Sequence, residues 1–141
     1  MENTPTRERK MNNKISDKSD DILLQNSPND NNYTIENFRK ILKDFVVERN
    51  WESYHTPRAL SEAISIEAAE LLENFLFKQD DEISQELSPI TDEMADIFIY
   101  LINLVNALNL PNFTEVILKK IQHNGKKYPI DKYSGKNYKK L

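Results

Sequence analysis

Apolar residues recur every three or four positions along most of the chain after residue 33, and this spacing predicts amphipathic helices. No segment shows the alternation of apolar and polar residues, with a period of two, that is typical of a strand. The pattern therefore predicts an all-α protein. Four helices of a bundle-type domain are expected, over residues 34–49, 56–77, 88–108 and 112–125.

Residues that favour helix termini stand at the ends of these segments. N-cap residues are predicted at Thr34, Thr56, Ser88 and Asn112. Pro57 and Pro89 then occupy the first helical position, where the missing N–H costs nothing. Tyr33 and Phe38 are placed to form a hydrophobic staple across the first N-terminus. These residues predict where the helices begin better than where they end.

The remaining segments are polar. Residues 78–87 are expected to form a solvated acidic linker, Gly125 to lie in the last helix's C-cap, and the residues after Pro129 to form an irregular basic tail. Residues 1–33 are rich in Asn, Ser, Asp and Lys, and such a segment buries too little apolar surface to offset its ordering entropy. We expect a disordered, dispensable extension over 1–33 and one folded domain over 34–141.

The helix over 88–108 carries apolar side chains around most of its circumference. The residues concerned are Ile90, Met94, Ile97, Phe98, Ile99, Leu101, Ile102, Leu104, Val105 and Leu108. At about 100° per residue they leave one narrow polar strip, so this helix is expected to be buried nearly all round. The strip holds Asp92, Glu93, Asp96, Tyr100 and Asn103. Its acids are therefore expected to face a cleft within a bundle.

Two pairs of carboxylates dominate the candidate chemistry. Glu67 and Glu70 lie three residues apart on the second helix, and Glu93 and Asp96 repeat this spacing on the third. Two like charges about 5 Å apart repel by roughly 3 kcal/mol at an effective dielectric near 20, so converging carboxylates require a cation or protons. An all-oxygen site suits a hard cation, and we expect Mg²⁺, with Mn²⁺ as an alternative.

Charge is distributed unevenly along the 141 residues. Residues 34–110 hold fifteen acidic and six basic side chains, whereas residues 111–141 hold two acidic and eight basic ones. The acidic central segment is suited to binding a metal ion, and the basic C-terminal segment to binding phosphate. Because the basic segment is short and the domain is acidic, no nucleic-acid partner is expected. With two Gly, neither a P-loop nor a Rossmann turn can be built. No apolar run resembles a signal peptide or spans a bilayer, so no membrane partner is expected, and the cytosol is the expected location.

Several other residues have both a structural and a functional interpretation. Trp51 is either a core anchor or a ligand contact, and His55 either a surface residue or a ligand contact. Glu52 and His55 match one Glu-x-x-His step of a di-iron bundle, but a di-iron site needs two such steps on helices. Lys120, Asn124 and Lys127 recur near helical spacing, which also describes an ordinary basic helix terminus.

Taken together, these motifs resemble the MazG-like nucleoside triphosphate pyrophosphohydrolases, and within them the small dCTP pyrophosphatase type. The resemblance spans roughly residues 38–141 and rests on four ordered motifs. They are Trp51-Glu52-x-x-His55-x-Pro57-Arg58-x-Leu60, Glu67-x-x-Glu70-Leu71-x-Glu73, Asp92-Glu93-x-Ala95-Asp96-Ile97-x-Ile99-Tyr100-Leu101 and Lys120-x-x-x-Asn124-x-x-Lys127-Tyr128-Pro129.

The resemblance implies a Mg²⁺-dependent hydrolase that cleaves a nucleoside triphosphate between its α- and β-phosphates, releasing the monophosphate and pyrophosphate. It implies metal ligation by Glu67, Glu70, Glu93 and Asp96. On physical grounds, Glu67 or Glu70 is expected to orient or deprotonate the attacking water. The resemblance also implies a homodimer or homotetramer whose helices complete each site. The substrate-binding residues it implies are Trp51, His55, Phe77, Lys120 and Asn124. We also expect Tyr100 and Asn103 to bind substrate, because they project from the same strip as Asp96, and Arg58 and Lys127, which stand within the motifs. Phe77 stands where dCTP-selective relatives tend to carry Trp, so the base remains open.

Two alternatives remain at this point. The chain could be a non-catalytic helical oligomerisation module whose acids are structural. It could also be a hydrolase of the same superfamily acting on dUTP or on a modified nucleotide.

Overall fold

The computed structural model describes residues 28–85 and 87–135, and these residues form helices without any strand. The helices are α2 (Ile35–Glu48), α3 (Pro57–Glu73), α4 (Asp80–Gln85), α5 (Leu87–Ala107), α6 (Phe113–Lys127) and α7 (Ile130–Tyr133). The predicted all-α class is confirmed. Most of the predicted N-terminal extension, residues 1–27, lies outside the described residues.

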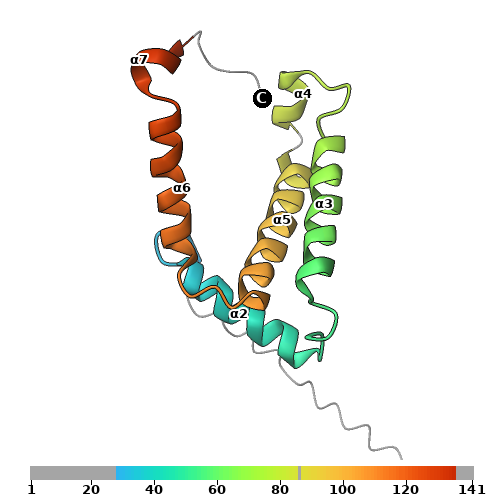
Figure 1. Cartoon of the computed structure of the whole chain (residues 1–141). Helices are drawn as coiled ribbons and strands as arrows, with labels where there is room; N and C mark the ends of the chain where they lie inside the picture. Colours follow the sequence, from blue (N-terminus) through green and yellow to red (C-terminus); the bar gives the residue numbers. More distant parts are fainter. Residues whose placement is uncertain (1–27, 86, 136–141) are drawn as a thin grey trace, which may run out of the picture.

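Helix α5 is the centre of the packing. Helix α3 runs antiparallel along it, and α2 crosses the C-terminal part of α5 at the base of the molecule (Figure 1). Helix α6 leaves from the same end and stands apart from α3 and α5 (Figure 1). Between helices of the described chain, extensive contacts join α5 to α3 and to α2. The polar strip of α5 and the acidic edge of α3 are therefore held side by side.

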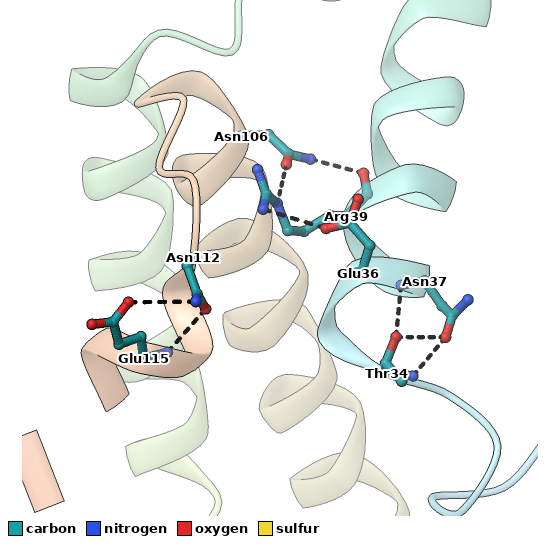
Figure 2. A network of polar contacts seen from close by, with 7 residues as sticks. All are labelled: Thr34, Glu36, Asn37, Arg39, Asn106, Asn112 and Glu115. Atoms are coloured by element: carbon teal, nitrogen blue, oxygen red, sulfur yellow. Dashed lines mark hydrogen bonds and ion pairs between the residues drawn. The ribbon is translucent and has the colours of Figure 1, made fainter. Parts of the chain in front are cut away.

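The predicted N-caps of three helices are confirmed. Thr34 Oγ1 accepts from the Asn37 N–H at 3.2 Å, and Asn37 Oδ1 accepts from the Thr34 N–H at 2.8 Å, which completes a capping box (Figure 2). The side chains of Thr56 and Asn112 cap α3 and α6 by accepting from the N–H groups of Ala59 and Glu115. The rings of Tyr33 and Phe38 lie 5.8 Å apart, as expected for a staple. Local sequence thus determines where these helices begin.

The ends and connections differ from the prediction in three places. Helix α3 ends at Glu73, before the predicted Phe77, because Asn74 caps it and Phe77 has a left-handed backbone with φ of 61°. The expected acidic linker contains helix α4, since Glu82 accepts from the Gln79 N–H at 2.7 Å and three acids complement the first turn. Helix α5 begins at Leu87, so Ser88 is not its N-cap.

At the C-terminal end, two further predictions are corrected. Helix α6 continues through Gly125 to Lys127, where the carbonyl of Asn124 accepts from the Tyr128 N–H at 2.8 Å. Helix α7 then forms in what was expected to be an irregular tail, and the rings of Tyr128 and Tyr133 meet edge-on at 5.3 Å. These aromatic contacts order the segment just after α6.

The core of the described chain is small. Its buried apolar residues are Val46, Leu60, Ile90, Ile102 and Val105. The prediction that the third helix is buried nearly all round is wrong for the single chain, because Met94 is 55 % exposed and Phe98 and Ile99 are also exposed. The physical reason is that only α2 and α3 pack extensively on α5 within the described chain, which leaves part of its apolar coat uncovered.

Helix α6 contains no buried residue, and Val116, Leu118 and Ile121 are all more than half exposed. Helix α3 likewise exposes Ile66 and Leu72. Among the described residues, no helix is both long and apolar enough to cross a membrane.

Candidate functional site

Three of the four predicted acids converge between α3 and α5. Glu67 projects from α3, and Glu93 and Asp96 project from successive turns of α5. One carboxylate oxygen from each lies within 4.8 Å of the others. Glu67 and Glu93 are half-buried, whereas Asp96 is exposed. The antiparallel packing of two helices thus brings together residues far apart in sequence.

The electrostatics of Glu67 reflect this crowding. Its pKa is raised above the ordinary value, first by partial burial and then by the negative charges of Glu70 and Asp96, with a hydrogen bond to Glu93 adding to the effect. Each cause disfavours the charged form of the carboxyl group. A cation placed among these oxygens would instead favour the charged form of Glu67.

The donor set fits a hard divalent cation. All three groups are carboxylates, they come from rigid helices, and one side remains open because Asp96 is exposed. Glu70 lies outside this group of three, one turn further along α3. Its charge nevertheless reaches Glu67, as the pKa of Glu67 shows.

A pocket of about 480 Å³ lies toward the other end of α5, between that helix, α2 and the loop that enters α3. Its lining residues are Glu36, Arg39, Lys40, Lys43, Val46, Val47, Glu52, His55, Asn103, Asn106, Ala107 and Asn109. Two of them, His55 and Asn103, were predicted as substrate-binding residues. Asn103 is 7 % exposed, which makes it the buried polar residue of α5.

The loop before α3 is organised by ring contacts. The rings of Trp51 and His55 are stacked, with centroids 6.2 Å apart, and Trp51 meets Phe45 edge-on at 5.9 Å. His55 Nδ1 lies 3.0 Å from the carbonyl oxygen of Trp51. Trp51 remains 43 % exposed, so it is not a buried core anchor in this chain. His55 is half-buried and is presented to the pocket.

The other predicted site residues are spread more widely. Tyr100 is half-buried on the polar strip between Asp96 and Asn103. Arg58 is exposed and pairs with Glu62 at 2.9 Å on the first turns of α3. Phe77 is fully exposed on the turn after α3. Tyr100 therefore lies on α5 between the carboxylate cluster and Asn103, whereas Arg58 and Phe77 are exposed within the described chain.

Lys120, Asn124 and Lys127 all lie exposed on α6. Because α6 stands apart from α3 and α5, the single chain does not bring these residues to the carboxylates (Figure 1). The Lys127 ammonium group instead lies 5.1 Å from the centroid of the Tyr128 ring.

The sequence did not indicate that residues of α2 form one wall of the pocket. Arg39, Lys40 and Lys43 lie on the polar face of α2, which from sequence alone is indistinguishable from a solvated face. Asn103 and Asn106 offered a weak signal, since their spacing of three places two carboxamides on neighbouring turns of α5, while Asn109 follows the helix with a left-handed backbone.

Comparisons with known proteins concern the family and the fold of the chain. A family model described as "MazG-like family" matches residues 63–141. The chain is 33 % identical over 103 residues to dCTP pyrophosphatase 1 of Bos taurus, and the match covers 69 % of this chain and 60 % of the bovine protein. It is 31 % identical to the Homo sapiens dCTP pyrophosphatase 1, covering 77 % and 68 % of the two chains.

Among solved structures, a pyrophosphatase from Archaeoglobus fulgidus DSM 4304 superposes with a TM-score of 0.63. The two sequences are 36 % identical, and the match covers 69 % of this chain and 94 % of the archaeal one. The chain thus shares its helical arrangement with a solved pyrophosphatase over most of that protein, and spans about 60 % of the bovine relative's length.

Proposed function

Because the chain belongs to the MazG-like family, we propose that it hydrolyses nucleoside triphosphates to the monophosphate and pyrophosphate. The observation that carries the proposal is the convergence of Glu67, Glu93 and Asp96 from two helices. The dCTP pyrophosphatase names of the mammalian relatives make dCTP the first substrate to test, followed by dUTP and modified nucleotides. We place the activity in the cytosol.

Glu67, Glu93 and Asp96 would hold the divalent cation, and Mg²⁺ is our first choice because every donor is a carboxylate oxygen. Such a cation would supply charge neutralisation and polarisation of phosphoryl oxygens. Glu70 is then available as the general base, since it lies one turn from Glu67 yet outside the group of three. Its carboxylate would orient the attacking water and take up the proton that the water releases.

The outgoing phosphates require positive charge that the carboxylate cluster cannot provide. Lys120 and Lys127 offer it, and Asn124 adds a neutral amide donor, but all three lie on α6, away from the cluster of their own chain. Apolar residues are exposed on α6, including Leu118 and Ile121, and separately on α3, including Leu72, and a second copy could cover them. We propose a homodimer or homotetramer in which α6 of one copy supplies phosphate contacts to the site of another.

The test is a product assay with purified full-length protein, each of the four common dNTPs, dUTP and Mg²⁺. We expect a nucleoside monophosphate and pyrophosphate in equal amounts, with no activity after chelation. A nucleoside diphosphate and orthophosphate as first products would contradict the proposed bond cleavage. Absence of turnover with the whole panel, at any Mg²⁺ or Mn²⁺ concentration, would favour the non-catalytic oligomerisation module.

A further inference from the structure

Two asparagines one turn apart at the end of α5 differ in what their side chains do. The Asn106 carboxamide is hydrogen-bonded at both of its polar atoms, because its Oδ1 accepts from Arg39 Nε at 3.0 Å and its Nδ2 donates to the Arg39 carbonyl at 2.9 Å (Figure 2). Asn103 is 7 % exposed, and within the part of the chain that the structure describes its carboxamide has no hydrogen-bond partner. Asn106 therefore has a structural role that Asn103 lacks.

The Asn103 carboxamide reaches the pocket between α2 and α5. Asn103 lines that pocket. In the described chain, every polar side-chain atom that is fully shielded from solvent has a hydrogen-bond partner, so the unpaired amide of Asn103 is not fully shielded. Its amide atoms therefore retain some exposure, and the pocket that Asn103 lines is adjacent to them. Polar groups in protein interiors are normally hydrogen-bonded, and so a buried amide directed into a cavity of about 480 Å³ is suited to a ligand.

The position of the pocket relative to the carboxylates indicates which part of a ligand it receives. Asn103 follows Asp96 by seven residues on the same strip of α5, which is about 10 Å along the helix axis at 1.5 Å per residue. Half-buried Tyr100 lies between them on this strip. A triphosphate held at the carboxylates with its nucleoside end along this strip would bring that end to the pocket.

The chemistry of the lining suits that end of the molecule. Asn103 offers one donor group and one acceptor, and Glu52 and His55 add further polar atoms at the pocket wall. A nucleobase edge presents complementary amines, ring nitrogens and carbonyls. Val46 and Val47 supply apolar surface against which a ring can lie.

We propose that Asn103 is a specificity-determining residue, whose carboxamide hydrogen-bonds the nucleoside end of the substrate in this pocket. This inference rests on the proposed function, and it adds the residue that distinguishes one nucleotide from another. A site built to hydrogen-bond a substrate discriminates strongly against analogues that leave its buried polar group unpaired.

The test measures kcat and KM for dCTP, dUTP, dTTP, dATP and dGTP with the full-length wild type and with Asn103→Leu, Asn103→Asp and Asn103→Gln. We expect Asn103→Leu to reduce the ratio of kcat/KM between the best and the worst substrate by about tenfold or more. The change should lie mainly in KM, because the contact is made away from the reacting phosphorus. Asn103→Asp, which can only accept at neutral pH, should change the order of the substrates, and Asn103→Gln should restore part of the selectivity.

Asn106→Leu is the matched variant for a merely structural asparagine. It should lower the melting temperature more than Asn103→Leu does, because it removes two hydrogen bonds that the structure contains. If Asn103→Asp and Asn103→Gln fold and keep the wild-type selectivity, the inference is wrong while the proposed function stands. If the wild type releases no pyrophosphate from any nucleotide, the proposed function itself fails. A change of oligomeric state with unaltered selectivity would show that Asn103 serves subunit packing instead.

Discussion

Arg39 and Asn106 exchange two hydrogen bonds across a sequence separation of 67 residues and thereby join α2 to α5 (Figure 2). The Arg39 guanidinium donates to the Asn106 side chain, and the Asn106 amide donates to the Arg39 carbonyl. The contact is partly buried and lies at the wall of the pocket. It therefore holds in register the two helices that form the proposed nucleoside subsite.

Asn106→Leu is expected to destabilise the protein by about 1–3 kcal/mol, because it leaves both groups of Arg39 without their partners in a partly buried position. Urea denaturation followed by circular dichroism measures this change. Glu36→Gln is the control, since it removes only the ion pair of Arg39 with an exposed carboxylate at 3.4 Å. The control should cost less than about 1 kcal/mol. An equal loss of unfolding free energy in the two variants would show that the reciprocal hydrogen bonds of Arg39 and Asn106 stabilise the fold no more than the surface ion pair does.

Asp96→Asn should abolish metal-dependent turnover, because it removes one of three converging carboxylate donors. It should also raise the stability of the metal-free protein at neutral pH, by roughly 0.2–1 kcal/mol, since one of several neighbouring negative charges is lost. Thermal melts in EDTA and with added Mg²⁺ test both statements. Asp92→Asn is the control, because Asp92 is an exposed acid on α5 outside the group of three. Wild-type activity in Asp96→Asn would remove the site assignment.

The stability of the metal-free protein should depend on pH through Glu67. The pKa of Glu67 is raised in the folded state, so between its ordinary value and that raised value the folded chain binds more protons than the unfolded chain. The stabilising contribution of Glu67 to the free energy of unfolding is therefore fully present below its ordinary pKa and is lost as pH rises through the raised pKa of the folded state. Unfolding in EDTA as a function of pH should show this slope in the wild type and a smaller slope in Glu67→Gln. An identical slope in both proteins would contradict the assignment.

The exposed apolar residues of α6 lead to a prediction about assembly. Ile121→Asp should weaken self-association by about 2 kcal/mol or more, because it places a charge on the proposed interface. Turnover should fall with it, since α6 of the second copy would carry the phosphate contacts. Gln122→Glu adds a negative charge to a neighbouring exposed polar position and should leave assembly unchanged. Light scattering at several concentrations distinguishes the states, and a fully active wild-type monomer would refute this assembly.

Local signals made the helix starts predictable. Thr34, Thr56 and Asn112 cap the residues that follow them, and each contact lies within three residues of sequence. The end of α3 was predicted less well because Phe77 is itself apolar and extends the helical pattern, while its left-handed backbone cannot be inferred from residue type. Ser88 shows the opposite error, since a good capping residue followed by Pro lies within α5.

The candidate site was predictable only where its chemistry is unusual. Glu67, Glu93 and Asp96 could be grouped because acids that converge from two largely apolar helices repel one another unless a cation or protons neutralise them. Lys43 and Asn106 were missed because polar residues on an amphipathic helix usually face solvent. The exposure of Met94 was unpredictable for a related reason: apolar periodicity indicates that a face is covered, but not whether the covering surface belongs to the same chain.

The proposed reaction is the attack of water on the α-phosphorus of a nucleoside triphosphate. Hydrolysis of dCTP by the wild-type protein with Mg²⁺ in ¹⁸O-labelled water, followed by mass spectrometry of both products, tests this reaction without any mutation. We expect one labelled oxygen in the nucleoside monophosphate and unlabelled pyrophosphate. Label in the pyrophosphate would place the attack on the β-phosphorus, and labelled orthophosphate beside a nucleoside diphosphate would place it on the γ-phosphorus; either result would contradict the proposed reaction.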